Sequence, residues 1–235
     1  MYEKCALLTY YTLTPLHMGT GSSVYYIDLP IQRERHTSFP IMAGSGIKGV
    51  FRNLAERRWE EKTVNDIFGY EEAHEGASKI ALTDAKILLY PVRSLRSTFT
   101  WITCPLVLRR FKEELESLSQ KVEWEIPKVE DNKALLCENS SLKIDEKHIG
   151  LEEFVFDSEE SKEAKAIADF MGKYLPKISM VSTLPERLAI VSDNVFADFV
   201  NYAVEIRTRI RIDQITGTVQ EGALFTMEFV PSEAI

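Results

Sequence analysis

Cysteine is scarce in this chain of 235 residues, and the pattern of the few cysteines excludes two classes of protein. Cys5, Cys104 and Cys137 are odd in number, lie far apart and include no C-x-x-C pair. A small scaffold held by disulfides and a zinc site of the C-x-x-C type are therefore both excluded. We expect reduced thiols, most of them buried.

Long apolar runs are also missing. No uninterrupted stretch approaches the roughly 20 apolar residues that a membrane-spanning helix needs. The start of the chain, Met1-Tyr2-Glu3-Lys4, is followed by alternating residues and lacks the apolar core of a signal peptide. The sequence therefore predicts a cytoplasmic protein with no membrane partner.

A surplus of basic residues, common in proteins that bind nucleic acid, is absent as well. The chain has 36 acidic and 28 basic residues, and its net charge is -8. The excess is local, because residues 112–163 contain 16 acids and 7 bases and leave the rest of the chain nearly balanced. The net charge therefore does not exclude a nucleic-acid partner. We expect the acidic stretch at about 112–163 to be an insertion packed loosely on a single domain that spans residues 1–235.

Helical and extended patterns are mixed along the chain, which indicates an α+β fold. In the helix expected at 161–174, the buried face should carry Ala164, Ile167, Ala168 and Met171. Other helices are predicted at 47–59, at 111–118 and, after an N-cap at 192–194, through residue 199. Aromatic and β-branched residues predict strands at 5–13, 78–89, 98–103 and 187–191.

The segment 40–52 is rich in glycine and in hydrogen-bond donors. Its glycines release the backbone from Cβ sterics, and its serine, lysine and arginine place donors beside the exposed amides. Because a helix is predicted to start inside this loop, its N-terminus would direct N–H groups at a phosphate or another anion. The residues concerned are Gly44, Ser45, Gly46, Lys48, Gly49 and Arg52.

The common nucleotide motifs do not account for this segment. A P-loop is excluded, because Lys48 is followed by Gly49 and Val50 and not by a hydroxyl residue. The spacing G-x-G-x-x-G of dinucleotide-binding proteins is present, but no adequate strand precedes it. A glycine-rich helix entry that serves only close packing therefore remains an alternative.

Residues 204–213 alternate strictly between aliphatic or threonine residues and charged residues. This pattern predicts a strand whose polar face carries Arg207, Arg209 and Arg211. A turn containing Gly217 and Gly222, then a second strand, complete a β-hairpin at about 204–230. A charged strand face is usually only solvated, but arginines at every second residue favour a contact with phosphates.

Two motif blocks carry a resemblance to a known family. The first comprises Leu16-His17-Met18-Gly19, Asp28 and the glycine segment 44–52. The second runs from Arg207-x-Arg209-Ile210-x-Ile212-Asp213-x-x-Thr216-Gly217-Thr218 to Glu221-Gly222-Ala223-Leu224-Phe225. In these blocks the chain resembles the RAMP superfamily of CRISPR proteins, and more narrowly the backbone subunit of the type III-B (Cmr) effector, its fourth subunit, of the Cas-seven group. It departs from the pattern at Met227-Glu228-Phe229, where relatives tend to carry a Glu-Glu-Tyr-like run.

The resemblance implies a modified ferredoxin-like (RRM-like) palm with inserted finger regions and a β-hairpin thumb at about 204–230. It implies that several copies, with other Cmr subunits, stack into a filament along a guide RNA (crRNA) and cut bound target RNA at regular intervals. The implied cleaving residue is Asp28, and His17 matches a nearby family histidine. A divalent metal, magnesium or manganese, is also implied, with Asp28 as a ligand. The glycine segment and the hairpin arginines would hold RNA.

RNA cleavage by the adjacent 2′-hydroxyl needs in-line geometry, a proton acceptor and charge relief at the phosphate. A loop carboxylate can position a metal or act as the base. Asp28 can equally be a surface carboxylate or a turn former, and His17 can pack the loop or contact RNA. Three other functions stay open: a non-catalytic RNA-binding scaffold, the equivalent subunit of a type III-A complex, and a phosphometabolite enzyme with a deep small-molecule pocket at the glycine loop.

Overall fold

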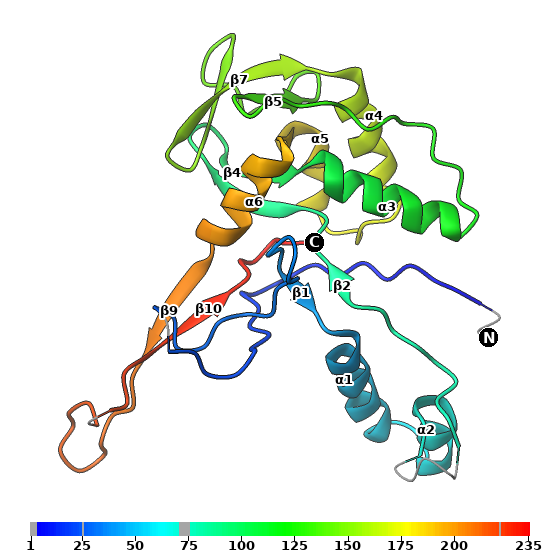
Figure 1. Ribbon diagram of the computed structural model, residues 1–235, viewed down its shortest axis with the longest axis vertical. Helices are drawn as coiled ribbons and strands as arrows, with labels where there is room; N and C mark the ends of the chain where they lie inside the picture. Colours follow the sequence, from blue (N-terminus) through cyan, green and yellow to red (C-terminus); the bar gives the residue numbers. More distant parts are fainter. Residues whose placement is uncertain (1–3, 25, 71–75, 221) are drawn as a thin grey trace.

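The computed structural model describes residues 4–24, 26–70, 76–220 and 222–235, so Glu221 of the second motif block lies outside the described residues. Helices and strands are mixed along the chain, as the sequence predicts (Figure 1). The main sheet contains β3 (Tyr90–Ser94), β4 (Thr98–Thr103), β5 (Lys133–Leu136), β6 (His148–Leu151), β7 (Phe154–Glu160) and β8 (Leu188–Ile190). Its helices are α3 (Pro105–Ser117), α4 (Lys162–Met171), α5 (Leu184–Arg187) and α6 (Asp193–Tyr202), with a 3-10 turn, η1 (Val181–Thr183).

The six strands lie in the order β3-β4-β8-β5-β7-β6, and one pairing between Ser94 and Leu151 closes the sheet into a barrel. The pairs β4–β8 and β5–β7 are parallel, and the other pairs are antiparallel. The helices α3, α4 and α6 gather around this sheet (Figure 1). Among the residues described, each helix is too short or too polar to cross a lipid bilayer.

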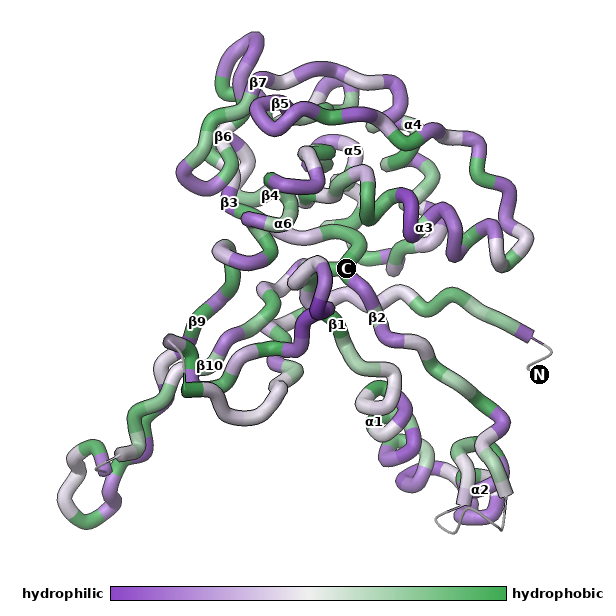
Figure 2. The backbone as a smooth tube through the Cα atoms, in the orientation of Figure 1, coloured by the Kyte–Doolittle hydropathy of each residue, from purple (hydrophilic) through white to green (hydrophobic). Residues whose placement is uncertain are grey.

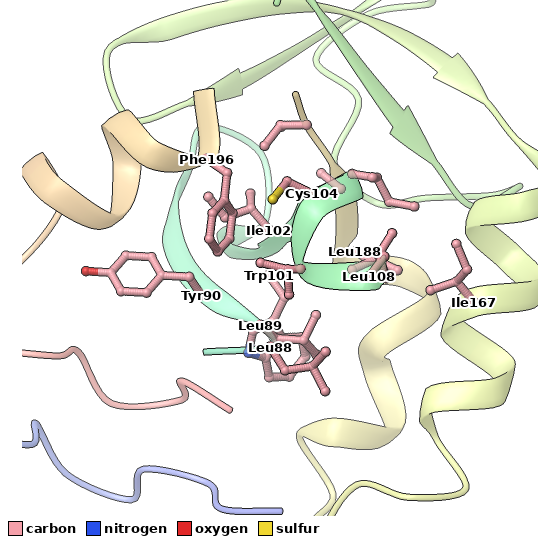
Figure 3. Packing of buried hydrophobic residues seen from close by; sticks show 14 of the residues in the cluster. Leu88, Leu89, Tyr90, Trp101, Ile102, Cys104, Leu108, Ile167, Leu188 and Phe196 are labelled. Carbon is pink, nitrogen blue, oxygen red and sulfur yellow. The ribbon is translucent and has the colours of Figure 1, made fainter. Parts of the chain in front are cut away.

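The core lies between the sheet and these helices (Figure 3). Trp101 of β4, Leu108 of α3, Ile167 of α4 and Phe196 of α6 are fully enclosed. Burying each such side chain contributes about 1.5–3 kcal/mol, so the core residues together hold the helices to the sheet. The face predicted for the helix at 161–174 is confirmed, because Ala164, Ile167, Ala168 and Met171 are all buried.

The acidic stretch 112–163 is not packed loosely on the core, and that expectation is wrong. It supplies β5, β6 and β7 of the closed sheet, and Ala134, Leu136, Ile149 and Leu151 are fully enclosed. Its apolar residues occur in runs of only three or four, because each strand enters the core briefly between charged turns. No periodic pattern is long enough to show this in the sequence.

Local patterns predicted some of the other elements. The strand at 98–103 is confirmed as β4, and Ser192 caps α6 by accepting a hydrogen bond from Val195 N. The prediction of a strand at 5–13 is wrong, because the described residues there form no ladder. Several of their bonds to the fold come from Thr12, whose N donates to Ala234 O at 3.0 Å and whose O accepts from Glu233 N at 2.8 Å. Of the strand predicted at 78–89, only residues 85 and 86 are extended in a ladder, as β2 (Ala85–Lys86).

Two arms extend from the body (Figure 1). The first holds α1 (Gly44–Glu56) and α2 (Glu61–Phe68), and it joins the body through β1 (Ile41–Met42), which pairs with β2. It has its own small core of Ala55, Val64 and Phe68.

The second arm is the predicted hairpin, formed by β9 (Glu205–Arg209) and β10 (Phe225–Phe229). Figure 2 shows hydrophobic residues at its tip, where Ile215 is 95% exposed.

Candidate active site

Strand β10 has hydrogen-bonded neighbours on both edges. Strand β9 lines one edge, and the loop of residues 16–31 lines the other. Leu29 N donates to Thr226 O at 3.0 Å, and Glu228 N donates to Leu29 O at 3.0 Å. Because the bonds of a strand alternate between its two edges, this loop acts as the second neighbour of β10. Both residues predicted for cleavage, His17 and Asp28, belong to the loop, so the fold brings them to one strand edge.

Asp28 is exposed, and one of its carboxylate oxygens is held by Thr226. Oδ2 accepts from Thr226 N at 2.7 Å and from Thr226 Oγ1 at 2.9 Å, and Asp28 N donates to Thr226 Oγ1 at 3.1 Å. The backbone N–H of Thr226 and then its hydroxyl hold the pKa of Asp28 below its ordinary value, since both stabilise the ionised form. The carboxylate is therefore ionised at neutral pH, and Oδ1 is not bonded to any other described residue.

His17 is half-buried beside the same strand. Its Nδ1 lies 2.7 Å from Glu228 O, and its ring packs on Phe229 with 5.4 Å between the ring centroids. A carbonyl only accepts, so Nδ1 carries the proton and Nε2 of the neutral ring keeps its lone pair. Asp28 is bonded to residue 226 and His17 to residue 228, and two residues that are two positions apart in a strand are separated by about 7 Å. The contacts with the carbonyl and the ring support a packing role for His17 and leave Nε2 for a proton or for RNA.

A buried ion pair below these residues was missed by the sequence analysis. Glu228 is 4% exposed, its Oε1 is paired with Arg33, and its Oε2 accepts from Ile31 N at 2.9 Å. Arg33 also donates to Val200 O and to Asn201 Oδ1, each at 3.0 Å. The pair therefore ties the loop and β10 to the end of α6. The available signal was a glutamate set directly between hydrophobic residues at 227, 229 and 230.

Gln32 connects this loop to the first arm and was also missed. Its Nε2 donates to Gly19 O at 3.1 Å, and its Oε1 accepts from Ala43 N at 3.3 Å. Ala43 is the N-cap residue directly before α1, so the helix of the glycine segment starts next to the loop that carries His17. A single glutamine in a polar run gives no pattern that would reveal such a bridge.

The glycine segment is helical and is not a loop, which corrects the expected geometry. α1 begins at Gly44, and Gly44 N donates to Asp84 Oδ1 at 2.8 Å. A Cβ at Gly44 would lie 2.2 Å from Leu82 O, so this glycine serves close packing, as the alternative interpretation held. Gly46 and Gly49 have nothing within 4 Å of a Cβ and lie on the open helix surface with Ser45.

Lys48 and Arg52 differ in their contacts. Arg52 donates to Gly69 O at 2.8 Å and to Asn65 Oδ1 at 2.9 Å, and it pairs with Glu56. It therefore fastens α2 to α1 and has few donors left for RNA. Lys48 is half-buried and forms no ion pair with another described residue.

The three hairpin arginines do not form one continuous row. Arg207 and Arg209 lie in β9, and Arg211 lies beyond its end. The β9–β10 ladder ends at the Arg209–Phe225 pair, and the next bridge joins Ile212 to Val219. Two residues separate these pairs on the side of β9, and five separate them on the side of β10. Arg207 pairs with Glu205 and lies over Phe229, 5.2 Å from its centroid, so Phe229 contacts both the hairpin and His17. Arg209 and Arg211 are exposed and form no ion pair within the described part of the chain.

One cavity of about 670 Å³ lies between the N-terminal segment and the first arm. Its walls are largely apolar and include Leu7, Phe51 and Ile87. Of the six residues predicted to hold phosphate in the glycine segment, none lines it. This arrangement gives the phosphometabolite hypothesis no support.

A divalent cation fits this site only in part. The described residues contain no group of three or more histidine, cysteine or acidic side chains placed to hold a metal ion. Asp28 offers one carboxylate with an available oxygen, while Mg²⁺ takes about six oxygen ligands and usually keeps several waters. The chain could therefore supply one ligand, and water and RNA phosphate would supply the others.

Comparisons with known proteins agree with the resemblance. The model of the RAMP superfamily matches residues 9–234. The CRISPR system Cmr endoribonuclease Cmr4 of Pyrococcus furiosus is 43% identical over 99% of this chain and 79% of its own length. The CRISPR system CMR subunit Cmr4 of Saccharolobus solfataricus is 24% identical over 97% of this chain and 84% of its own.

Two solved structures share the fold. The crystal structure of oligomeric Cmr4 from Pyrococcus furiosus superposes with a TM-score of 0.74 and 33% identity over 95% of this chain and 75% of that one. A chain in the cryo-EM structure of the type III-B Cmr-beta bound to cognate target RNA superposes with a TM-score of 0.72 and 24% identity, over 95% of this chain and 78% of that one. With nearly its whole length matched, this chain belongs to the RAMP superfamily.

Proposed function

We propose that this chain is a guide-RNA-binding backbone subunit of a type III-B CRISPR complex and that it cleaves bound target RNA at Asp28. The observation that carries the cleavage role is the geometry of Asp28, an exposed and ionised carboxylate held through one oxygen with the other oxygen available. The relative that is 43% identical to this chain is a Cmr endoribonuclease, which supports the same activity here.

The fold suits the parts that such a subunit needs. The closed sheet with its helices would form the body of a ferredoxin-like palm, the α1–α2 arm would be a finger, and the β9–β10 hairpin would be the thumb. The two arms extend from one side of the body, with the loop of His17 and Asp28 at the base of the hairpin (Figure 1). An RNA strand lying across this side could contact Lys48 on the first arm and Arg209 and Arg211 on the hairpin, which form no ion pair with other described residues.

The partners follow from this arrangement. The related Cmr4 crystallised as an oligomer, and we propose that copies of this chain also stack into a filament with other Cmr subunits. Each copy carries one Asp28, so copies spaced evenly along a guide RNA would cut a paired target RNA at even intervals. Guide and target RNA would be bound mostly through phosphates, which carry no sequence information, and base pairing would select the target.

The RNA itself supplies the nucleophile for cleavage, so the chain needs only to position the reacting groups and help to move a proton. The 2′-hydroxyl beside the scissile phosphate attacks the phosphorus, so a 2′,3′-cyclic phosphate forms while the bond to the 5′-oxygen breaks and that oxygen takes a proton from water. The chain must orient the hydroxyl in line and help remove its proton. Asp28 Oδ1 is the only oxygen of this carboxylate not already engaged by Thr226, and it would accept or orient that proton. His17 would fix the loop through its bond with Glu228 O. A magnesium or manganese ion held by Asp28 would supply charge relief at the phosphate when bound.

The test is Asp28→Asn in a complex assembled with guide and target RNA. We expect cleavage to be lost while RNA binding persists, because the amide keeps the shape of the carboxylate but not its charge or basicity. Asp145→Asn is a matched control, since Asp145 is also exposed and its pKa is also lowered by backbone N–H groups, but it lies before β6, outside the loop that lines β10. Unchanged cleavage in Asp28→Asn would remove Asp28 from the cleaving role, whereas the scaffold function predicts no metal-dependent cleavage by any assembly that contains this chain.

A further inference from the structure

Thr226 contacts Asp28 through three hydrogen bonds that form a closed arrangement. The Thr226 hydroxyl donates to Asp28 Oδ2 and accepts from Asp28 N, while Thr226 N donates to the same Oδ2. A hydroxyl has one proton, so this pattern fixes its rotation as well as the carboxylate. Both bonds to the carboxylate use Oδ2, which leaves Oδ1 as the oxygen available to a ligand.

The position of Thr226 on β10 explains why it can reach Asp28. Its N–H and C=O point away from β9, toward the loop, where Thr226 O also accepts from Leu29 N at 3.0 Å. Its side chain is half-buried beside the same edge, and its β-branched shape suits a strand. Across the ladder its partner is Thr208, which has the same side chain on the same face but is one strand farther from the loop.

We propose that Thr226 is the positioning residue for Asp28: its hydroxyl orients the carboxylate so that Oδ1 is the oxygen presented to the RNA. The inference rests on the proposed function, because the orientation matters for cleavage only if Asp28 is the cleaving group. Thr226 itself does not touch the reacting atoms. The inference adds to the reaction a residue on the hairpin, which places the thumb strand in the catalytic arrangement.

The surroundings of Asp28 leave Thr226 as the residue that orients its carboxylate. Among the described residues other than Asp28 itself, only Thr226 donates hydrogen bonds to the Asp28 carboxylate, and no ion pair among them includes this aspartate. The acidic groups on the elements packed against it are both paired, Glu228 with Arg33 and Glu205 with Arg207. Arg207 and Arg209 alternate with Thr208, so they lie on the opposite face of the hairpin. His17 is held through Nδ1, which lies 2.7 Å from Glu228 O. Hydrogen bonds from one residue therefore set the orientation of the Asp28 carboxylate.

The test compares three variants of the full chain. Thr226→Val keeps the shape and the backbone N–H but removes the hydroxyl, Thr226→Ser restores a hydroxyl, and Thr208→Val makes the same change on the neighbouring strand. We would record the ¹³C chemical shift of the Asp28 carboxyl by NMR at one neutral pH. We expect this shift to change in Thr226→Val, which loses a hydrogen bond to Oδ2, and to stay near the wild-type value in Thr226→Ser and Thr208→Val.

Cleavage in the assembled complex gives the second readout. We expect Thr226→Val to slow target cleavage about tenfold with RNA affinity unchanged, as misorientation of a reacting group does, and Thr226→Ser to recover most of the rate. A wild-type carboxyl chemical shift together with a wild-type cleavage rate in Thr226→Val would overturn the inference. If Asp28→Asn still cleaved, the proposed function itself would fail. If Asp28→Asn stopped cleavage while Thr226→Val behaved as wild type, only the positioning role would fail.

Discussion

Breaking the Arg33–Glu228 pair tests how the candidate site is held in place. Arg33→Met removes the cation but keeps most of the aliphatic length, so Glu228, whose side chain is 5% exposed, loses its charge partner. Removing one member of a buried pair costs about 3–5 kcal/mol. Because the Arg33 side chain is 19% exposed, water can approach the vacated place, and we expect the lower end, about 3 kcal/mol.

Equilibrium unfolding in urea, followed by circular dichroism, measures this loss. With a slope of about 2 kcal/mol per molar urea, the unfolding midpoint should fall by about 1.5 M. Lys121→Met is the matched control, because it breaks an exposed pair with Glu123, and it should leave the midpoint unchanged. We also expect slower target cleavage in Arg33→Met, since Glu228 O holds His17 and Glu228 N holds Leu29, the neighbour of Asp28.

The double variant Arg33→Met/Glu228→Met separates two contributions to the free energy of unfolding: the cost of leaving Glu228 buried without a cation, and the net stabilisation by the ion pair. It leaves no buried charge, so most of the lost stability should return. Recovery should be incomplete, because Ile31 N loses its acceptor. A loss below about 1 kcal/mol in Arg33→Met, or equal losses in the single and double variants, would refute the reasoning.

Two further outcomes are expected. Gly44→Ala should lower the midpoint of thermal unfolding, because its Cβ would lie 2.2 Å from Leu82 O. Gly46→Ala should raise the free energy of unfolding by about 0.5–1 kcal/mol, because alanine is favoured over glycine in a helix and its Cβ would have nothing within 4 Å. The pKa of Asp28 is lowered from 3.8, so its ionised form and its contribution to stability are present above that value and are lost only as the pH falls through the lowered pKa. The rate of target cleavage should therefore not fall between pH 8 and pH 5 through protonation of Asp28. A fall in the rate within this range, at a pH that changes in the Asp28→Glu variant, would contradict this.

Sequence patterns revealed the elements whose signal is local. The buried face of α4 repeats at helical spacing, β4 is a compact aromatic run, and the alternation of residues 204–213 marks the hairpin. Each of these needs only neighbouring residues to form its pattern. The hairpin prediction was incomplete, because the offset before the Ile212–Val219 bridge depends on how the two arms pair.

The parts that the sequence could not reveal depend on contacts between distant residues. Arg33 meets Glu228 across 195 positions, and Gln32 bridges Gly19 and Ala43 without any motif. The helical start at Gly44 depends on Asp84, 40 positions later, which accepts from the first amide. The family resemblance pointed to Asp28 and His17, and only the fold shows that one edge of β10 holds both.

Strand β10 couples the hairpin to the candidate active site. Its register with β9 sets Thr226 opposite Thr208, and its other edge sets Thr226 against Asp28, so both contacts come from one peptide segment. Under the proposed function, RNA held near Arg209 of β9 would lie one strand away from the carboxylate that cuts. Thr226 pairs with Thr208 in the ladder and also binds the Asp28 carboxylate, so one residue joins the hairpin to the candidate cleaving group. The distance from hairpin to cut is therefore a property of the protein and not of the RNA sequence, which is what cleavage at even intervals requires.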